Sequence, residues 1–319
     1  SGTLLANIDL TNRCNLDCDF CFANARACGF IYEPSFDEIV KMMQLLRAEK
    51  PVPAPAVQFS GGEPTMRDDL MELIRKAKEI GFPQVQLATN GIKMAQDVGY
   101  VEDLKSAGLS TVYLHFDGVT KETNSKIKSD EKAVRNCEDV GLGVVLVPTI
   151  IKGRNDHEIG PIIRYAADHI KAVRGVNFPP IAFTGAASEE DVQRERITIP
   201  ELLEDIEDQT SGIIRKSDFY PVPCVVPFSD LVEAYTGLPQ VRFTPHQHCG
   251  AATYVFITDK GMVPINRMVD VESFFRSIEN LTEKLKKGGQ LNKYLSLIEG
   301  IREMNDSFRK SEQGSTAQF

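Results

Sequence analysis

The order of apolar and polar residues along the first 214 positions predicts strands and helices in regular alternation. Short apolar runs bounded by turn residues are typical of buried strands, whereas apolar residues three or four positions apart indicate one face of a helix. The expected strands span residues 4–11, 56–62, 84–90, 110–118, 143–150 and 175–183. The expected helices span residues 35–50, 67–81, 96–108, 121–141 (as one helix or two), 156–170 and 200–214.

Strand–helix units in succession predict one parallel sheet with right-handed crossovers. The strands read as too apolar to belong to separate hairpins. Both an open doubly wound sheet and a curved barrel-like sheet fit this order of elements. Each places its ligand sites at the carboxyl ends of the strands, so the residues that follow each strand are the candidates for function.

The pattern changes after about residue 215. The stretch "YPVPCVVPFSDLVEAYTG" is rich in proline and then helical, and "QVRFTPHQHCGAATYVFITDKGMVPINR" reads as a hairpin around "TDKG". We therefore expect two parts, residues 1–214 as the sheet domain and residues 215–319 as an α+β extension. The polar end, "RKSEQGSTAQF", has the composition of a disordered tail.

Composition limits the partners and the compartment. A formal net charge of -9 and no visible cluster of Lys and Arg argue against a nucleic-acid partner. No apolar run is long enough for a transmembrane helix, and no signal peptide opens the sequence. Seven unevenly spaced cysteines do not resemble a disulfide framework, which indicates a reducing, cytoplasmic setting.

Three cysteines lie close together in "TNRCNLDCDFCFANA", residues 11–25. Cys14, Cys18 and Cys21 follow the first expected strand at a spacing that lets three thiolates meet one face of an iron–sulfur cube. The fourth iron would then have no protein ligand, unlike the four-cysteine clusters that only transfer electrons. A structural zinc site, which usually needs four ligands, and chance clustering are the alternatives.

The motif Cys14-x3-Cys18-x-Phe20-Cys21 resembles the signature of the radical S-adenosylmethionine (SAM) superfamily. The resemblance implies a partial (β/α)6 barrel of the TIM type and a four-iron four-sulfur cluster whose open iron chelates the amino and carboxylate groups of SAM. It places the aromatic ring of Phe20 near the adenine. Reduction of the cluster would cleave SAM to methionine and a 5′-deoxyadenosyl radical.

Motifs after the next two strands agree with a SAM site. In "FSGGEPT", Gly61 and Gly62 let backbone approach a ligand closely, and Glu63 offers an acceptor for an ammonium group. This motif resembles the Gly-Gly-Glu-Pro segment of the superfamily, although alone it also fits an ordinary turn. In "LATNG", Thr89 and Asn90 are candidates for hydrogen bonds to the ribose or carboxylate of SAM.

Candidates after the fourth and fifth strands are fewer. His115 and Asp117 are two positions apart, so their side chains point to one face and are candidates for polar contacts to SAM. The alternative is a hydrogen-bonded core histidine beside a turn aspartate. In "VPTI", Thr149 and its apolar neighbours are a candidate wall for adenine.

Motifs along nearly the whole chain, including "CFANARACGFIYEPSFDEI", "VNFPPIAFTG" and "PHQHCGAATYVF", resemble the archaeal tetraether lipid synthases and the class D radical SAM methylases. We expect the first activity, carbon–carbon coupling of isoprenoid lipid tails. Methylation of a pterin precursor is the second interpretation, and an iron–sulfur electron carrier is a third. The expected partners are a lipid or small-molecule substrate and a reductant protein such as ferredoxin or flavodoxin, with peripheral membrane contact for a lipid.

This resemblance also implies further metal ligands in the second half of the chain. Cys224 and Cys249 match cysteines of those relatives and are candidates for an auxiliary iron–sulfur cluster, with His246 and His248 nearby. Ordinary buried thiols are the alternative for both cysteines. The lipid and pterin interpretations predict different surroundings near the cluster, an apolar channel for the first and a compact polar pocket for the second.

Overall fold

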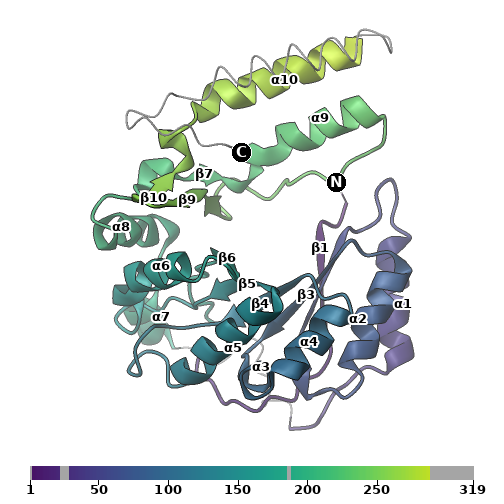
Figure 1. Cartoon of the computed structure of the whole chain (residues 1–319), viewed down its shortest axis with the longest axis vertical. Coiled ribbons are helices and arrows are strands. Elements are labelled where there is room, and N and C mark those ends of the chain that lie inside the picture. The colour runs from purple at the N-terminus through teal and green to yellow at the C-terminus, as the bar shows by residue number, and fades with distance from the viewer. Residues whose placement is uncertain (1, 22–28, 185–187, 288–319) are drawn as a thin grey trace. The chain divides into compact units, whose positions relative to one another are not determined.

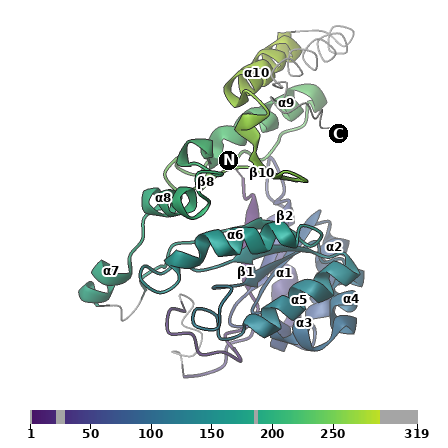
Figure 2. The same ribbon diagram turned by 60° about the vertical axis from the view of Figure 1, so that its left-hand side comes forward.

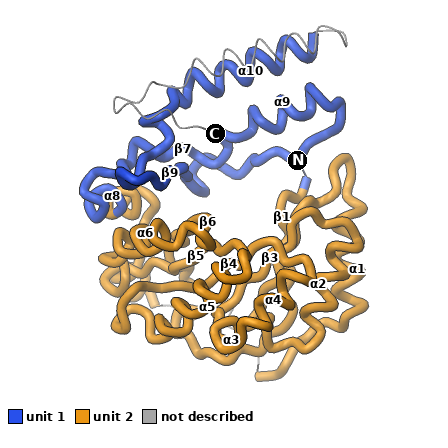
Figure 3. Tube along the Cα trace, viewed as in Figure 1, with its two compact units in different colours: residues 1–2, 206–319 blue, residues 3–205 orange. Residues whose placement is uncertain are grey.

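The computed structural model describes residues 2–21, 29–184 and 188–287. The chain forms two compact units, residues 3–205 and residues 206–319 together with the first two residues (Figure 3). The division falls within helix α8 (Ile199–Gln209). The domain boundary that we expected after residue 214 is nine residues beyond this division, and that expected boundary stays a prediction.

The larger unit contains one six-stranded sheet in the order β1-β2-β3-β4-β5-β6 (Figure 1). Every neighbouring pair is parallel. The strands are β1 (Leu5–Asp9), β2 (Ala56–Ser60), β3 (Gln84–Thr89), β4 (Thr111–His115), β5 (Gly143–Val147) and β6 (Val173–Val176). The expected parallel α/β sheet is therefore confirmed, and it is the curved, partial (β/α)6 barrel rather than an open doubly wound sheet.

Helices connect the strands, and helices α2, α4 and α5 lie on the same side of the sheet in two views (Figures 1 and 2). Local signals set their ends: the Ser35 hydroxyl caps α1 through a capping box with Glu38, and Gly81 ends α2 in the left-handed conformation. The helices of this unit are α1 (Phe36–Arg47), α2 (Leu70–Ile80), α3 (Ile92–Gln96), α4 (Val98–Ser106), α5 (Ile127–Val140), α6 (Ile159–Asp168) and α7 (Glu189–Glu195).

Two helices differ from expectation. The segment expected as one helix over residues 96–108 is preceded by the short α3 and begins at Asp97, whose side chain caps α4. Helix α7 was not expected, because its apolar positions are few. Its start is fixed by a capping box between Ser188 and Asp191.

The two faces of the sheet differ in polarity. Alternate residues of β2 to β5, such as Phe59 and Leu114, are fully buried and form the core with the helices. The residues between them point to the other side, which we call the inner face. On β1 to β4 this inner face carries mostly polar side chains, so these strands are less apolar than expected. The inner-face polar residues of these strands are Asn7, Asp9, Gln58, Ser60, Gln84, Gln86, Thr111, Tyr113 and His115.

The smaller unit contains helix α9 (Val226–Thr236), helix α10 (Val271–Lys287) and an antiparallel hairpin of β9 (Val255–Thr258) and β10 (Gly261–Pro264). The hairpin around "TDKG" is therefore confirmed, while α10 was not expected. The polar tail expected to be disordered lies outside the described residues. In the part of the chain that the structure describes, every helix is too short or too polar to cross a bilayer.

Candidate functional site

Gly61 and Gly62 seat the cysteine-bearing loop against the end of strand β2. The N–H of Gly62 donates to the carbonyl oxygen of Thr11 at 2.6 Å, and the N–H of Glu63 donates to that of Arg13 at 2.7 Å. A Cβ on either glycine would overlap one of these carbonyl oxygens. The close approach expected at these glycines is thus made by the protein's own loop, and their contact with a ligand stays a prediction.

Glu63 joins the ends of two strands through a buried carboxylate that is 1% exposed. Its Oε1 accepts hydrogen bonds from the N–H and hydroxyl of Thr65 and from the hydroxyl of Thr89 at 2.7 Å. Its Oε2 accepts from the N–H of Asn90 at 2.8 Å. The Asn90 side chain in turn donates to Asn15 in the cysteine loop at 2.7 Å. The residues expected at the ends of β2 and β3 therefore form one network.

The candidates after β4 and β5 form a second network. The Nε2 atom of His115 lies 2.8 Å from Oδ2 of Asp117, so their side chains share one face as expected. The other oxygen of Asp117 accepts from the N–H of Thr149 at 3.2 Å. The His115 ring packs at a centroid distance of 5.9 Å from Phe20, the aromatic residue of the cysteine motif. A side chain that sequence did not single out, Asn155, donates to the carbonyl oxygens of Asp117 and Thr149.

The three cysteines lie within electrostatic reach of one another. Burial, the charge of Asp117, and the neighbouring Cys21 and Cys14 together raise the pKa of Cys18 to about 11. The N–H of Leu16 lies 3.4 Å from the sulfur of Cys14, and the N–H of Cys21 donates to the carbonyl oxygen of Cys18. Cys18 is half-buried and Cys21 is exposed, so the loop presents thiols to a ligand.

Arg67 holds both ends of this loop together, a role that sequence reasoning missed. Its Nη1 donates to the carbonyl oxygen of Leu10, at the start of the loop, and to that of Pro34, at its end. Asp69 fixes the guanidinium through two bonds, at 2.8 and 2.7 Å. The side chain of Arg67 is 7% exposed, so it pairs these carbonyl groups where water has little access.

Lys126 and Asp130 form a buried ion pair beneath the second network. The lysine nitrogen lies 2.9 Å from Oδ2 of Asp130 and also donates to the carbonyl oxygen of His115 at 3.0 Å. Burial raises the pKa of Asp130, against the opposing effect of Lys126 and a hydrogen bond from Asn124. The charge of Lys126 also acts to lower the pKa of Cys18. The four-residue spacing on helix α5 was the available signal for this pair.

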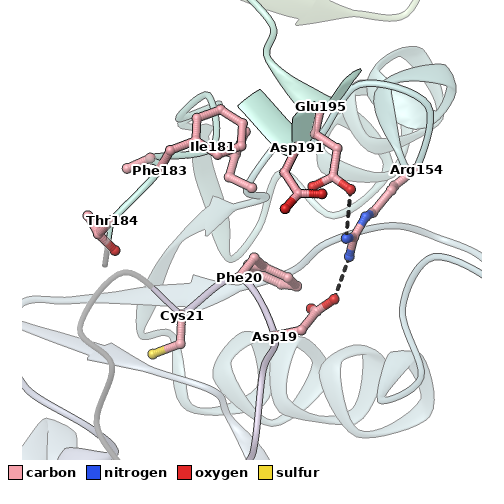
Figure 4. A pocket seen from close by; sticks show the side chains of 10 residues that line it. Asp19, Phe20, Cys21, Arg154, Ile181, Phe183, Thr184, Asp191 and Glu195 are labelled. Atoms are coloured by element: carbon pink, nitrogen blue, oxygen red, sulfur yellow. Dashed lines mark hydrogen bonds and ion pairs between the residues drawn. The ribbon is translucent and has the colours of Figure 1, made fainter. Parts of the chain in front are cut away.

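A cavity of about 340 Å³ opens beside the cysteine motif. Figure 4 shows Arg154, after β5, bridging Asp19 of the cysteine loop and Glu195 of α7, at 2.6 and 3.0 Å. Hydrogen bonds from Arg194, which has the larger effect, and from Arg154 hold the pKa of Glu195 below its usual range. The cavity is lined by Asp19, Phe20, Cys21, Arg154, Ile181, Ala182, Phe183, Thr184, Asp191 and Glu195. It combines an aromatic wall with charged groups, and only Phe20 and Cys21 were anticipated.

Comparison with known proteins places this site in a family. The model of the radical SAM superfamily matches residues 8–166, which contain the end of β1, the cysteine motif and strands β2 to β5. The chain is also 30% identical over 226 residues to a probable GTP 3′,8-cyclase of Saccharolobus islandicus, covering 67% of this chain and 68% of that protein. The chain belongs to the radical SAM superfamily.

A second relative is more similar in sequence. The chain is 50% identical over 295 residues to the 7,8-dihydro-6-hydroxymethylpterin dimethyltransferase of Methanocaldococcus jannaschii, covering 90% of this chain and 58% of that protein. The chain thus spans somewhat more than half the length of this relative. Among solved structures, HydG, a maturase of the FeFe-hydrogenase, aligns with a TM-score of 0.49 at 14% identity, covering 65% of this chain and 50% of that one.

Radical SAM enzymes use a four-iron four-sulfur cluster and SAM, and the cysteine loop suits such a cluster. In the described ranges no three His, Cys, Asp or Glu side chains surround a single metal-ion position. A cube holds each thiolate on a different iron, so its ligands do not need to meet at one point. An N–H group directed at the Cys14 sulfur and the nearby charge of Lys126 are features that tune such clusters.

The other cysteines differ in their surroundings. Cys224 is half-buried in a short 3-10 turn and Cys249 is exposed. The imidazoles of His246 and His248 pack against each other, with ring centroids 4.8 Å apart. Within the described residues these side chains do not form a metal-ion site, and the auxiliary cluster stays a prediction. Cys137 is 1% exposed within α5, which suits a structural thiol, and Cys28 lies outside the described residues.

Proposed function

We propose that this chain is the radical SAM part of an enzyme that methylates a reduced pterin. The observation that carries this choice is the 50% identity, over 90% of the chain, to a protein named as a 7,8-dihydro-6-hydroxymethylpterin dimethyltransferase. It reverses our sequence-based order, in which coupling of lipid tails came first and pterin methylation second.

In this proposal Cys14, Cys18 and Cys21 hold the four-iron four-sulfur cluster, which supplies one-electron cleavage of SAM when bound. Phe20 and the adjoining cavity receive the adenosine of SAM, because an aromatic ring with polar groups beside it suits a nucleoside. The Glu63 network shapes the end of the sheet on which the methionine part of SAM rests. Thr89, Asn90, His115, Asp117 and Thr149 complete this surface.

The polar inner face of the sheet supports a pterin over a lipid. A full (β/α)8 barrel fills its interior with bulky branched side chains, and a channel for an isoprenoid tail would also be apolar. The inner face of β1 to β3 instead presents Asn7, Asp9, Gln58 and Gln86. An alkyl chain laid on these groups could not pair their remaining donors and acceptors, at a cost of about 1–3 kcal/mol for each buried group left unpaired.

The named substrates of the two relatives share one chemical feature. A pterin and the guanine of GTP both carry a pyrimidinone ring with an amino group next to a ring N–H and a carbonyl oxygen. We call this side of the ring the aminopyrimidinone edge. A chain related to both proteins is expected to bind a ring with this edge. The electron for SAM cleavage would come from a small reductant protein such as ferredoxin or flavodoxin.

The test is methylation of the pterin, followed with SAM that carries deuterium in its methyl group. The SAM that the cluster cleaves leaves as methionine and keeps its methyl group, so a methyl group added to the pterin comes from a second SAM or from another one-carbon donor. A reduced folate that carries a methylene group is therefore supplied as well. Anaerobically reconstituted and reduced protein is given 7,8-dihydro-6-hydroxymethylpterin or, in parallel, an isoprenoid diether lipid, and the products are weighed by mass spectrometry. We expect a pterin heavier by one or two methyl groups, labelled only if a second SAM donates them, together with 5′-deoxyadenosine and methionine. The Cys18→Ala variant should give none of these products. Cross-linked lipid tails, with the pterin left unmethylated, would restore the lipid interpretation.

A further inference from the structure

The inner face of the sheet contains a row of amide side chains at one register. Asn7 of β1 pairs with Gln58 of β2, and Gln58 pairs in turn with Gln86 of β3. The row continues on β4 with Thr111, the partner of Gln86. Because strand residues in register lie about 5 Å apart, these side chains form a continuous polar strip across four strands.

This strip is unusual for a parallel sheet, which is normally apolar on both faces. The amide nitrogen of Gln58 donates to Asn7 at 3.3 Å, a long bond. The side-chain carbonyl oxygens of Gln58 and Gln86 are buried, and neither accepts a hydrogen bond from any described residue. An unpaired buried acceptor costs stability, and two of them at one register make this strip a candidate binding surface.

A second polar row lies two residues further along the strands, about 7 Å closer to their carboxyl ends. The hydroxyl of Ser60 donates to the exposed carboxylate of Asp9, its register partner on β1. On β4 the same step leads from Thr111 to Tyr113, and the next leads to His115, whose ring contacts Phe20 of the cysteine motif. The polar strip is therefore continuous with the surface beside the cysteine loop.

We propose that Gln58 and Gln86 bind the aminopyrimidinone edge of the substrate on this inner face, with Asp9 beside the ring one row nearer the cysteine loop. The inference rests on the proposed function and adds the residues that recognise the ring. The two unpaired amide oxygens are acceptors, and the edge offers the ring N–H and the amino group as donors. The amide nitrogens of the glutamines are donors that suit its carbonyl oxygen.

The strip also sets how far the reacting end lies from the cluster loop. A fused two-ring system bound by one edge at the Gln58 and Gln86 row extends past the row of Asp9 and Tyr113. Its far end, which carries the substituents, then points toward His115 and the cysteine loop. The same geometry holds a ring at its edge and leaves the opposite end free for chemistry, as a methylation site requires.

The experiment measures binding of 7,8-dihydro-6-hydroxymethylpterin to reconstituted protein by calorimetry. The test variants are Gln58→Leu and Gln86→Leu, which remove the unpaired amides at similar size. The matched control is Gln84→Leu, on the same strand and the same face as Gln86, because Gln84 lies at the start of β3 and already donates to Thr111 at 3.0 Å. SAM affinity, measured on each variant, reports whether the rest of the site is intact.

We expect each test variant to bind the pterin about tenfold more weakly, the loss of one hydrogen bond, while Gln84→Leu and all SAM affinities stay near wild type. A pterin analogue with the amino group replaced by hydrogen should bind wild type weakly and lose little more in Gln86→Leu. Wild-type pterin affinity in both test variants would overturn this inference and leave the proposed function standing. Failure of the wild-type protein to bind any pterin would instead overturn the proposed function.

Discussion

The carboxylate of Glu63 accepts a hydrogen bond from the backbone N–H of Asn90 at 2.8 Å, and so fastens the end of strand β2 to the end of strand β3. The same carboxylate accepts a hydrogen bond from the hydroxyl of Thr89. Glu63 thus shapes the candidate SAM surface through protein groups, whether or not one of its oxygens also meets the amino group of SAM.

Replacing Glu63 should therefore affect stability as well as SAM binding. Glu63→Ala leaves buried donors of Thr65, Thr89 and Asn90 without their acceptor, and we expect the free energy of unfolding of cluster-free protein to fall by about 3 kcal/mol. Urea denaturation measures this, with the exposed Glu72→Ala on α2 as control, expected within about 0.5 kcal/mol of wild type. SAM affinity, by calorimetry, should fall as well. If Glu63→Ala unfolds with the same free energy as wild type, the Glu63 network does not contribute to stability.

Gly62→Ala should impair assembly of the cluster. The added methyl group would overlap the carbonyl oxygen of Arg13 and displace the cysteine loop, an overpacking cost of about 1–3 kcal/mol. Gly175→Ala in β6 is the matched control, because a Cβ there has nothing within 4 Å. Iron content after anaerobic reconstitution is the measurement. Equal iron in the two variants would mean that the loop does not need this close approach.

Arg67→Met should loosen the same loop from its base. The change removes the donor to Leu10 and Pro34 and leaves Asp69 without its partner, so we expect a loss of about 2–3 kcal/mol in unfolding free energy. Reconstituted protein should also release iron to a chelator faster than wild type. Arg135→Met, at a side chain that is 66% exposed, is the control. Identical release rates for both variants would remove Arg67 from this role.

The raised pKa of Cys18 gives cluster-free protein a distinct pH dependence. Burial and the charge of Asp117 raise this pKa from 9.0 to about 11, so the folded state favours the thiol. The protonated Cys18 thiol stabilises the folded state below about pH 9, and this stabilisation is lost as the pH rises through about 11. Alkylation of Cys18 by iodoacetamide, followed by mass spectrometry, should show a midpoint near pH 11, and Asp117→Asn should lower it. A wild-type midpoint at or below pH 9 would contradict the described surroundings of Cys18.

The sequence predicted the strands and most helices because their signals are local. The capping box of Ser35 and Glu38 and the left-handed Gly81 are each contained within a few residues. The alternation of Asn7 and Asp9 with apolar neighbours was equally visible, but the short strands were interpreted as apolar as a whole. A count at period two would have revealed the polar inner face.

Most residues of the candidate site could be predicted from the sequence, but the residues to which they hydrogen-bond could not. The motifs named Glu63 and Gly62, but their hydrogen bonds go to protein groups that only the fold brings near. Arg154 and Glu195 are 41 positions apart in the sequence and form an ion pair beside the cysteine loop. No local spacing in the sequence predicts this pair. Long-range contacts of this kind are set by sheet topology rather than by sequence pattern.

The proposed roles depend on one claim, that Cys14, Cys18 and Cys21 hold a four-iron four-sulfur cluster with one iron open to SAM. Mössbauer spectroscopy of protein reconstituted with iron-57, before and after addition of SAM, tests it most directly. We expect about four irons bound at this site, one of which changes its isomer shift when SAM is added, and loss of this cluster from the triple Cys→Ala variant. Spectra that SAM leaves unchanged, or a triple variant that keeps its full iron content, would contradict the claim.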